Sequence, residues 1–184
     1  MRHLPEQKVT FIHNPKTAGT SISTWLDENF NTIQGRKHGH IVEVNEFFPR
    51  TEITFGVVRN PWERLASWYM FSNFTNTPFK DWLLQRFSQF ERNLSYQPFL
   101  LWARNWYRLD TPQHQWFGTN TIILRYENLN KDFEQIQKLL DCDKPLPYVN
   151  KSVDYDYKEL YTSETRDLVW DVYLKDIVEY GYAY

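Results

Sequence analysis

Cysteine is almost absent from the 184-residue chain, which contains a single one, Cys142. A lone cysteine cannot form an internal disulfide, and its surroundings, "DCDKP", lack the spaced Cys and His residues of a zinc site. We therefore expect neither a disulfide framework nor a metal, and we interpret Cys142 as having no part in function.

Long apolar runs and linker-like tracts are also missing. The opening "MRHLPEQKVTF" has no long apolar run after its basic residue, and no segment approaches the ~18 apolar residues of a membrane span. The chain has no repeat of fixed period, low-complexity tract or Gly/Ser linker. We expect a soluble, cytoplasmic protein without stable membrane insertion, folded as a single domain over residues 1–184.

A strong charge of either sign is lacking, because the formal net charge is −2. The chain therefore has no basic field that would favour nucleic acid as a partner, and an anion site would have to be built locally. Aromatic residues are plentiful, at 18% with eight Trp. Core packing and stacking against sugars are both open as explanations of these rings.

Three short runs rich in β-branched and aromatic residues predict buried strands: "KVTFIH" (8–13), "EITFGVV" (52–58) and "TIILRY" (121–126). Apolar spacing, Pro61 and Gly181 predict helices at 21–30, 61–71, 78–90, 131–140 and 163–180. Strands that alternate with helices indicate an α/β fold with a parallel sheet. Ligands of such sheets bind beyond the carboxyl ends of the strands.

The segment after the first predicted strand, "NPKTAGTS" (14–21), is dense in hydrogen-bond donors. Pro15 restricts the backbone, and Gly19 can adopt conformations closed to other residues, so the chain can turn tightly and aim N–H groups inward. These groups, the helix dipole and the Lys16 ammonium suit a phosphate. Three hydroxyl groups can donate to its outer oxygens, those of Thr17, Thr20 and Ser21.

The same turn is open to two other interpretations. Thr20 or Ser21 could only cap the following helix, with Lys16 in solvent. A Walker A loop is disfavoured, because that motif places its lysine after the second glycine, whereas Lys16 comes before Gly19. The order of these residues argues against ATP or GTP.

The run "FGVVRNPWERLASWY" (55–69) repeats the pattern of strand, turn and helix. Arg59, at the end of the strand, could bind an anion with two parallel hydrogen bonds, although a structural ion pair is an equal alternative. Glu63 and Arg64 are expected to make ordinary surface contacts. Two anion sites at the ends of two strands suggest a nucleoside with phosphates at both ends, which is the shape of 3′-phosphoadenosine 5′-phosphosulfate (PAPS).

The motifs "PKTAGTS" and "RNPWERLASWY" resemble the two cofactor-binding signatures of the sulfotransferases, in particular the carbohydrate branch that contains the uronyl and heparan sulfate 2-O-sulfotransferases. Weaker similarity continues through "TIILRYENL" and "LPYVNKS" to the closing "YGY", so it covers most of the chain. The resemblance implies the sulfotransferase fold, a P-loop NTPase-like parallel sheet flanked by helices. It also implies PAPS as donor, adenosine 3′,5′-bisphosphate as product and no metal.

The same resemblance implies which residues bind the donor. The 5′-phosphosulfate would be held by Lys16, Thr17, Ala18, Gly19, Thr20 and Ser21, and the 3′-phosphate by Arg59 and Ser67. Lys151 and Ser152 match a late loop that often lies near the nucleotide in the family.

Sulfuryl transfer by in-line displacement needs a base at the acceptor hydroxyl and a cation at the leaving oxygen. Lys16 suits the second task, and "KHGH" (37–40) offers two histidines for the first. A similar segment in uronyl 2-O-sulfotransferases implies His40 as general base and His38 as an acceptor-binding or supporting residue. A structural role is the alternative; a metal site lacks Cys or carboxylate partners at suitable spacing.

Further expectations concern the remaining histidines and the acceptor. His13 borders the first turn and is expected to support it, while His114 has only a weak claim as a pocket residue. The short chain and its charge favour a small sugar, glycolipid head group or metabolite hydroxyl over a highly sulfated polymer. Two other functions stay open: a kinase-like phosphotransferase, and a non-catalytic nucleotide-binding module that would have no use for a base.

Overall fold

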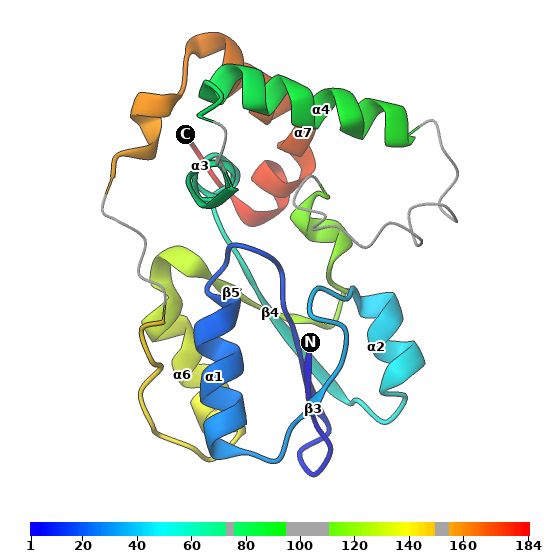
Figure 1. The fold of residues 1–184 in the computed structure, drawn as a ribbon. Helices are drawn as coiled ribbons and strands as arrows, with labels where there is room; N and C mark the ends of the chain where they lie inside the picture. The colour runs from blue at the N-terminus through cyan, green and yellow to red at the C-terminus, as the bar shows by residue number, and fades with distance from the viewer. Residues whose placement is uncertain (73–75, 95–110, 150–154) are drawn as a thin grey trace. The chain divides into compact units, whose positions relative to one another are not determined.

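The computed structural model describes residues 1–72, 76–94, 111–149 and 155–184 (Figure 1). The chain falls into two compact units, the first formed by Met1–Asn60 with Gln113–Val153 and the second by Pro61–Pro112 with Asp154–Tyr184. The sheet belongs to the first unit, and the described part of the second is helical. The expectation of a single domain stays a prediction.

Within the described residues, the first unit is built on a five-stranded sheet with the order β3-β1-β2-β4-β5. Its parallel part consists of β2 (Val9–Ile12), β4 (Ile53–Val58) and β5 (Ile122–Arg125), which correspond to the three predicted strands. β1 (Arg2–Leu4) and β3 (Ile33–Gln34) add an antiparallel edge that was not predicted. The predicted α/β class with a mostly parallel sheet is confirmed.

Helices cover both faces of this sheet (Figure 1). α1 (Gly19–Asn29) and α6 (Leu129–Leu139) pack with one face, and α2 (Ile41–Phe47) packs with the other. Alternation along β2 sets this arrangement, because Phe11 belongs to the first core and Ile12 to the second. Short 3₁₀ turns, η1 (Gln113–Gln115) and η2 (Tyr126–Asn128), flank β5.

Trp25 links α1 to the chain that follows α6. Its side chain is 1% exposed, and its indole N–H donates to the Lys144 carbonyl at 2.8 Å. Burial of a large aromatic side chain contributes roughly 2–3 kcal/mol, and the hydrogen bond satisfies its one polar atom. The segment after α6 is therefore held against α1.

The second unit contains α3 (Pro61–Ser72), α4 (Phe79–Leu94), η3 (Tyr157–Leu160) and α7 (Ser163–Tyr180). Its core is mainly aromatic, with Trp62, Trp68, Phe79, Trp82, Phe87 and Tyr173 among its members. Core packing thus accounts for these rings. α7 ends at Gly181, whose φ of 62° is left-handed, as the sequence predicted.

One prediction about α3 was wrong. Arg64 was expected at the surface but is 2% exposed, because it lies one turn before Trp68 on the face of α3 that is buried. Elsewhere the predicted helices 21–30, 78–90 and 131–140 correspond to α1, α4 and α6. None of the described helices is both long and apolar enough to cross a bilayer.

Candidate active site

The two donor-rich turns lie at the same edge of the sheet, where β2 and β4 end. Ile12 pairs with Gly56 in parallel register, so the chain leaves both strands on the same side. The guanidinium of Arg59 donates from Nη1 to the Lys16 carbonyl at 3.1 Å. Two motifs separated by about forty residues of sequence are therefore in direct contact.

The backbone of the first turn alternates in handedness. Lys16 and Ala18 have left-handed φ values of 65° and 59°, whereas Thr17 and Gly19 do not have positive φ. Such alternation turns successive N–H groups toward one point, which creates an anion-binding concavity. α1 begins at Gly19 immediately afterwards, and the first N–H groups of a helix have no acceptor within it. This backbone geometry is compatible with an anion at the turn, and anion binding there stays a prediction.

Gly19 is required for a different reason from the one predicted. Its φ is not in the left-handed region, so the predicted need for unusual backbone freedom was wrong. A Cβ at this position would lie 2.0 Å from the ring of His13, and glycine alone permits that close approach. The His13 ring is 6% exposed and so supports the turn by packing. Burial, assisted by nearby His38, holds the pKa of His13 well below its usual range.

The hydroxyls of the first turn have different roles. The Thr17 hydroxyl is fully buried and donates to the Asn14 carbonyl at 2.7 Å, so its hydrogen closes the turn instead of facing a ligand. Thr20 is exposed. The residue at the N-cap of α1 is Ala18, which rules out the alternative in which Thr20 or Ser21 caps the helix.

Ser21 connects the first turn to the chain after α6. Its Oγ accepts from the Val149 backbone N–H at 3.1 Å and donates to the Val149 carbonyl at 3.4 Å. The chain therefore reaches the start of α1 immediately before Lys151 and Ser152. These two predicted residues lie outside the described residues, so their roles stay a prediction.

Two cationic side chains lie close together at this edge. Arg59 is 4% exposed and its Cζ lies 3.9 Å from the centroid of the Tyr126 ring. Lys16 is half-buried, and burial, with the charge of Arg59 as a second cause, lowers the pKa of its ammonium to about 8. An anion bound beside these groups would offset the cost of burying the Lys16 ammonium and reduce its repulsion from Arg59. The electrostatics therefore favour a phosphate or sulfate ligand.

The sequence analysis missed Gln113, which joins the two turns. Its Oε1 accepts from the Arg59 backbone N–H at 3.0 Å and from the Asn14 side-chain amide at 3.1 Å, and its Nε2 donates to the Arg59 carbonyl at 2.8 Å. Asn14 also donates to the Val57 carbonyl at 3.0 Å. Neither side chain is exposed to solvent. Its neighbour His114, named as a pocket residue, is only half-buried in η1.

The two histidines of "KHGH" lie in the first unit and contact residues that adjoin the turns. Nδ1 of His38 is 3.1 Å from the His13 carbonyl, so this nitrogen carries the hydrogen, and the rings of His38 and His13 meet edge to face at 4.6 Å. The ring of His40 stacks on Trp116 with 4.1 Å between centroids. Its backbone N–H donates to Glu43 at 2.7 Å at the start of α2.

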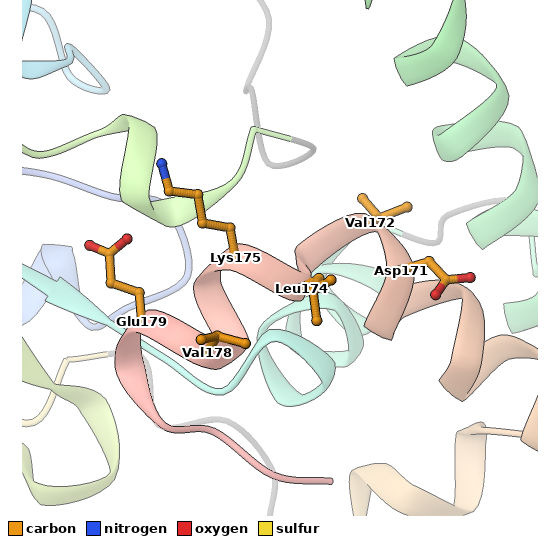
Figure 2. Close-up of a pocket in the computed structure, with 6 residues that line it drawn as sticks. All are labelled: Asp171, Val172, Leu174, Lys175, Val178 and Glu179. Carbon is orange, nitrogen blue, oxygen red and sulfur yellow. The ribbon is translucent and has the colours of Figure 1, made fainter.

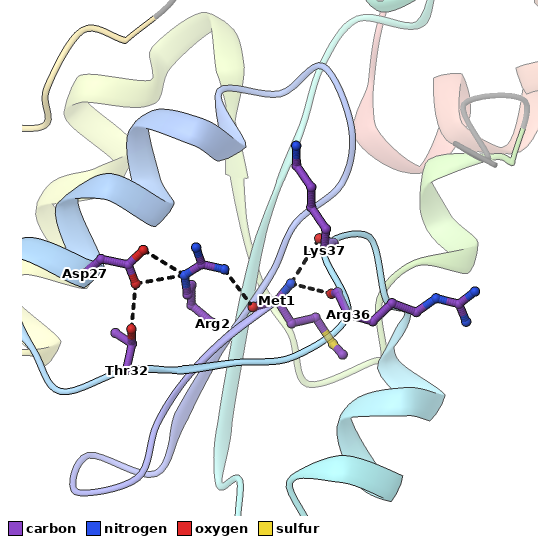
Figure 3. A network of polar contacts seen from close by, with 6 residues as sticks. All are labelled: Met1, Arg2, Asp27, Thr32, Arg36 and Lys37. Carbon is purple, nitrogen blue, oxygen red and sulfur yellow. Dashed lines mark hydrogen bonds and ion pairs between the residues drawn. The ribbon is translucent and has the colours of Figure 1, made fainter. Parts of the chain in front are cut away.

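The segment before these histidines is fixed by the residues at the start of β1 (Figure 3). The Met1 amine donates to the carbonyls of Arg36 and Lys37 at 2.7 and 3.0 Å. Arg2 forms an ion pair with Asp27 of α1 at 2.8 Å, and the Thr32 hydroxyl donates to the same carboxylate. The edge that the sequence did not predict thus anchors the chain that leads into His38.

Ser67 lies in the second unit, on α3. It is 5% exposed. Its proposed contact with the 3′-phosphate stays a prediction, as does the distance from Arg59 that such a contact would need.

A hollow of about 630 Å³ on α7 is a poor alternative site (Figure 2). It is lined by Asp171, Val172, Leu174, Lys175, Val178 and Glu179. Two carboxylates outnumber its one ammonium, so its charge disfavours a ligand with several phosphate or sulfate groups. The first-unit turns, with two cations and a backbone concavity, suit such a ligand better.

A comparison with protein families agrees with the general resemblance to sulfotransferases and does not address the carbohydrate branch. A model of the sulfotransferase family matches residues 2–183. No curated protein and no solved structure matches the chain. In the parts of the chain that the structure describes, no group of three or more His, Cys, Asp or Glu residues could hold a metal ion.

Proposed function

Because the chain belongs to the sulfotransferase family, we propose that it transfers a sulfuryl group from PAPS to a hydroxyl of a carbohydrate or small-molecule acceptor. The observation that carries this proposal is the contact between the two anion-binding turns, in which Arg59 reaches the Lys16 carbonyl at 3.1 Å. One ligand with two anionic ends can engage both turns at once. The mixed α/β fold, with its mostly parallel sheet, is the sulfotransferase fold.

The donor is assigned to the first turn and to the end of β4. Backbone N–H groups between Lys16 and Ser21 would hold the 5′-phosphosulfate, with the Thr20 hydroxyl exposed to add a further donor. Arg59 would serve the 3′-phosphate, with Ser67, Lys151 and Ser152 as further proposed contacts. The buried Thr17 hydroxyl is assigned to shaping the turn.

The proposed reaction is a single in-line displacement. A ring nitrogen of His40 accepts the proton of the acceptor hydroxyl as its oxygen bonds to sulfur, and the bond from sulfur to the bridging phosphate oxygen breaks. The Lys16 ammonium stabilises the negative charge that develops on that oxygen. His38 is assigned as an acceptor-binding or supporting residue, and its Nδ1 donates to the His13 carbonyl beside the first turn. The products are the sulfate ester and adenosine 3′,5′-bisphosphate, and no metal takes part.

The test combines ligand binding and transfer. The bisphosphate should raise the melting temperature in a dose-dependent way, since a ligand that prefers the folded state stabilises it. Labelled sulfate should pass from PAPS to members of a panel of sugars, glycolipids and metabolite alcohols, with or without EDTA. Absence of any shift at millimolar bisphosphate would refute the donor, and turnover only with ATP and magnesium would establish the kinase-like alternative.

Replacement of the base separates chemistry from binding. His40→Ala should reduce transfer by about 10²-fold or more while the bisphosphate binds as before, because a general base acts only on the reaction. Glu46→Ala is the control and should leave both properties unchanged, since Glu46 is exposed on α2, the helix that begins directly after His40. Normal turnover by His40→Ala would move the search for the base to His38.

A further inference from the structure

Gln113 contacts both turns of the proposed donor site with one buried amide. Its oxygen accepts from the Asn14 side chain in the first turn and from the Arg59 backbone N–H in the second. Its nitrogen donates to the Arg59 carbonyl at 2.8 Å. Arg59 is thereby held on its N–H and its C=O, as in the pairing of two strands, by a residue 54 positions away.

This set of bonds is specific to an amide of this length. An acceptor and a donor are needed side by side to match the N–H and C=O of Arg59, and glutamine supplies both. Methionine has similar length but neither function, and a glutamate would turn an acceptor toward the Arg59 carbonyl. Because Gln113 and Asn14 are both fully buried, water cannot replace the lost bonds at low cost.

The same short segment also holds the ring that contacts the proposed base. The backbone N–H of Trp116 donates to the backbone carbonyl of Gln113 at 3.0 Å across η1. The fully buried indole of Trp116 stacks on His40 at 4.1 Å with 23° between the planes. The Trp116 carbonyl accepts from the Ile41 N–H at 3.0 Å, at the start of α2. His40 is therefore fixed from the side of its ring and through the backbone of the next residue.

We propose that Gln113 and Trp116 form a brace, in which Gln113 positions the two donor-binding turns and Trp116 positions the base His40. The brace rests on the function proposed above and adds two positioning residues to it. Neither Gln113 nor Trp116 takes part in the reaction, and each acts through the residues that it holds. A displacement at Gln113 should affect both donor binding and turnover, whereas a displacement at Trp116 should affect turnover alone.

The first test compares Gln113→Met with Gln115→Met. Gln115 belongs to the same 3₁₀ turn but is exposed, so it controls for the chemistry of the substitution. Gln113→Met should weaken bisphosphate binding by about tenfold or more and raise the KM for PAPS, with a lower kcat. Gln115→Met should match the unsubstituted protein. Both variants are measured well below their melting temperatures, on protein whose folded fraction is known. Under these conditions, a loss of stability alone would leave Kd, KM and kcat unchanged.

The second test examines Trp116. Trp116→Leu should lower kcat by about tenfold while the Kd of the bisphosphate stays within about twofold, and Trp116→Phe, which keeps a ring against His40, should recover most of the turnover. If Trp116→Leu does not fold, the ring resonances of His40 provide the readout, because a stacked indole shifts them. They should move in Gln113→Met and stay in place in Gln115→Met.

A readout without ligand separates failure of the brace from failure of the proposed function. Hydrogen exchange of the Arg59 amide should accelerate in Gln113→Met and stay slow in Gln115→Met, whether or not the bisphosphate binds. The brace would be overturned if Gln113→Met left the exchange rate of the Arg59 amide unchanged. It would also be overturned if the unsubstituted protein bound the bisphosphate and Gln113→Met bound it with the same affinity. Faster exchange in a protein that does not bind it would leave the brace in place and refute the donor assignment.

Discussion

The partial burial of Lys16 leads to a testable dependence of ligand affinity on pH. Burial and the neighbouring Arg59 lower the pKa of its ammonium to about 8, so a large part of Lys16 is neutral at slightly alkaline pH. A bound phosphate or sulfate stabilises the ammonium and raises its pKa again. Binding therefore takes up a proton, and the affinity for the bisphosphate must fall as the pH rises above about 8.

The size of this effect follows from the pKa. If the bound anion restored the ordinary value of 10.5, the affinity would fall by about 25-fold between about pH 7 and about pH 9.5. Lys16 is partly exposed, so solvent and salt reduce the coupling. We expect a loss of about tenfold over this range, with the decline beginning near pH 8. The phosphates of the ligand do not titrate there, because their second pKa lies near 6.

Calorimetric titration with adenosine 3′,5′-bisphosphate at fixed ionic strength would measure this loss, and buffers of different ionisation enthalpy would report the proton uptake directly. Lys16→Arg is the matched control, because arginine keeps its charge throughout this range and its affinity should be nearly constant. Lys16→Met should bind weakly at every pH. A constant affinity of the unsubstituted protein from pH 7 to 9.5 would refute the argument that the ammonium contacts the anion.

Two further predictions concern the first turn. Gly19→Ala should lower the free energy of unfolding, measured in urea, by about 2 kcal/mol, because its Cβ would lie 2.0 Å from the His13 ring. The control Ala18→Gly should leave the free energy of unfolding unchanged or raise it, since φ is 59° at that position. Equal effects of the two substitutions would contradict the packing role of Gly19. The pKa of His13 is lower in the folded chain than its ordinary 6.5, so unfolding becomes easier as the pH falls below about 6.5, and His13→Phe should weaken this decline in a series of urea midpoints.

Local sequence patterns identify the elements that bury a recurring apolar face. The β-branched runs became β2, β4 and β5, and the range 163–180 predicted for the last helix agrees with Ser163–Tyr180 because Gly181 ends it. β1 and β3 have three and two residues, too few for an alternating pattern to be visible. Their pairing depends on contacts distant in sequence, which a local pattern does not contain.

In the candidate site, too, residues with a local sequence signal could be predicted and residues defined by distant contacts could not. Lys16 and Arg59 could be proposed from sequence because each follows a strand and opens a turn before a helix. Gln113 could not, since its significance lies in bonds to Asn14 and Arg59, which are 99 and 54 positions away. Arg64 was misplaced because charge alone suggested the surface, while its position on α3 put it on the buried face of the helix.

In the first turn the backbone is held in place by hydrogen bonds, whereas the charge of Lys16 is destabilised by its surroundings. Bonds from Thr17, Asn14 and Gln113 fix the backbone in a conformation that places left-handed φ on Lys16 and Ala18, at a cost of order 1–3 kcal/mol each. The same arrangement leaves the ammonium of Lys16 with a lowered pKa beside Arg59. A ligand anion would have little ordering of the backbone to complete, and would relieve a repulsion that is already present. Its binding free energy should therefore come mainly from charge, which is the term that also stabilises a leaving oxygen in sulfuryl transfer.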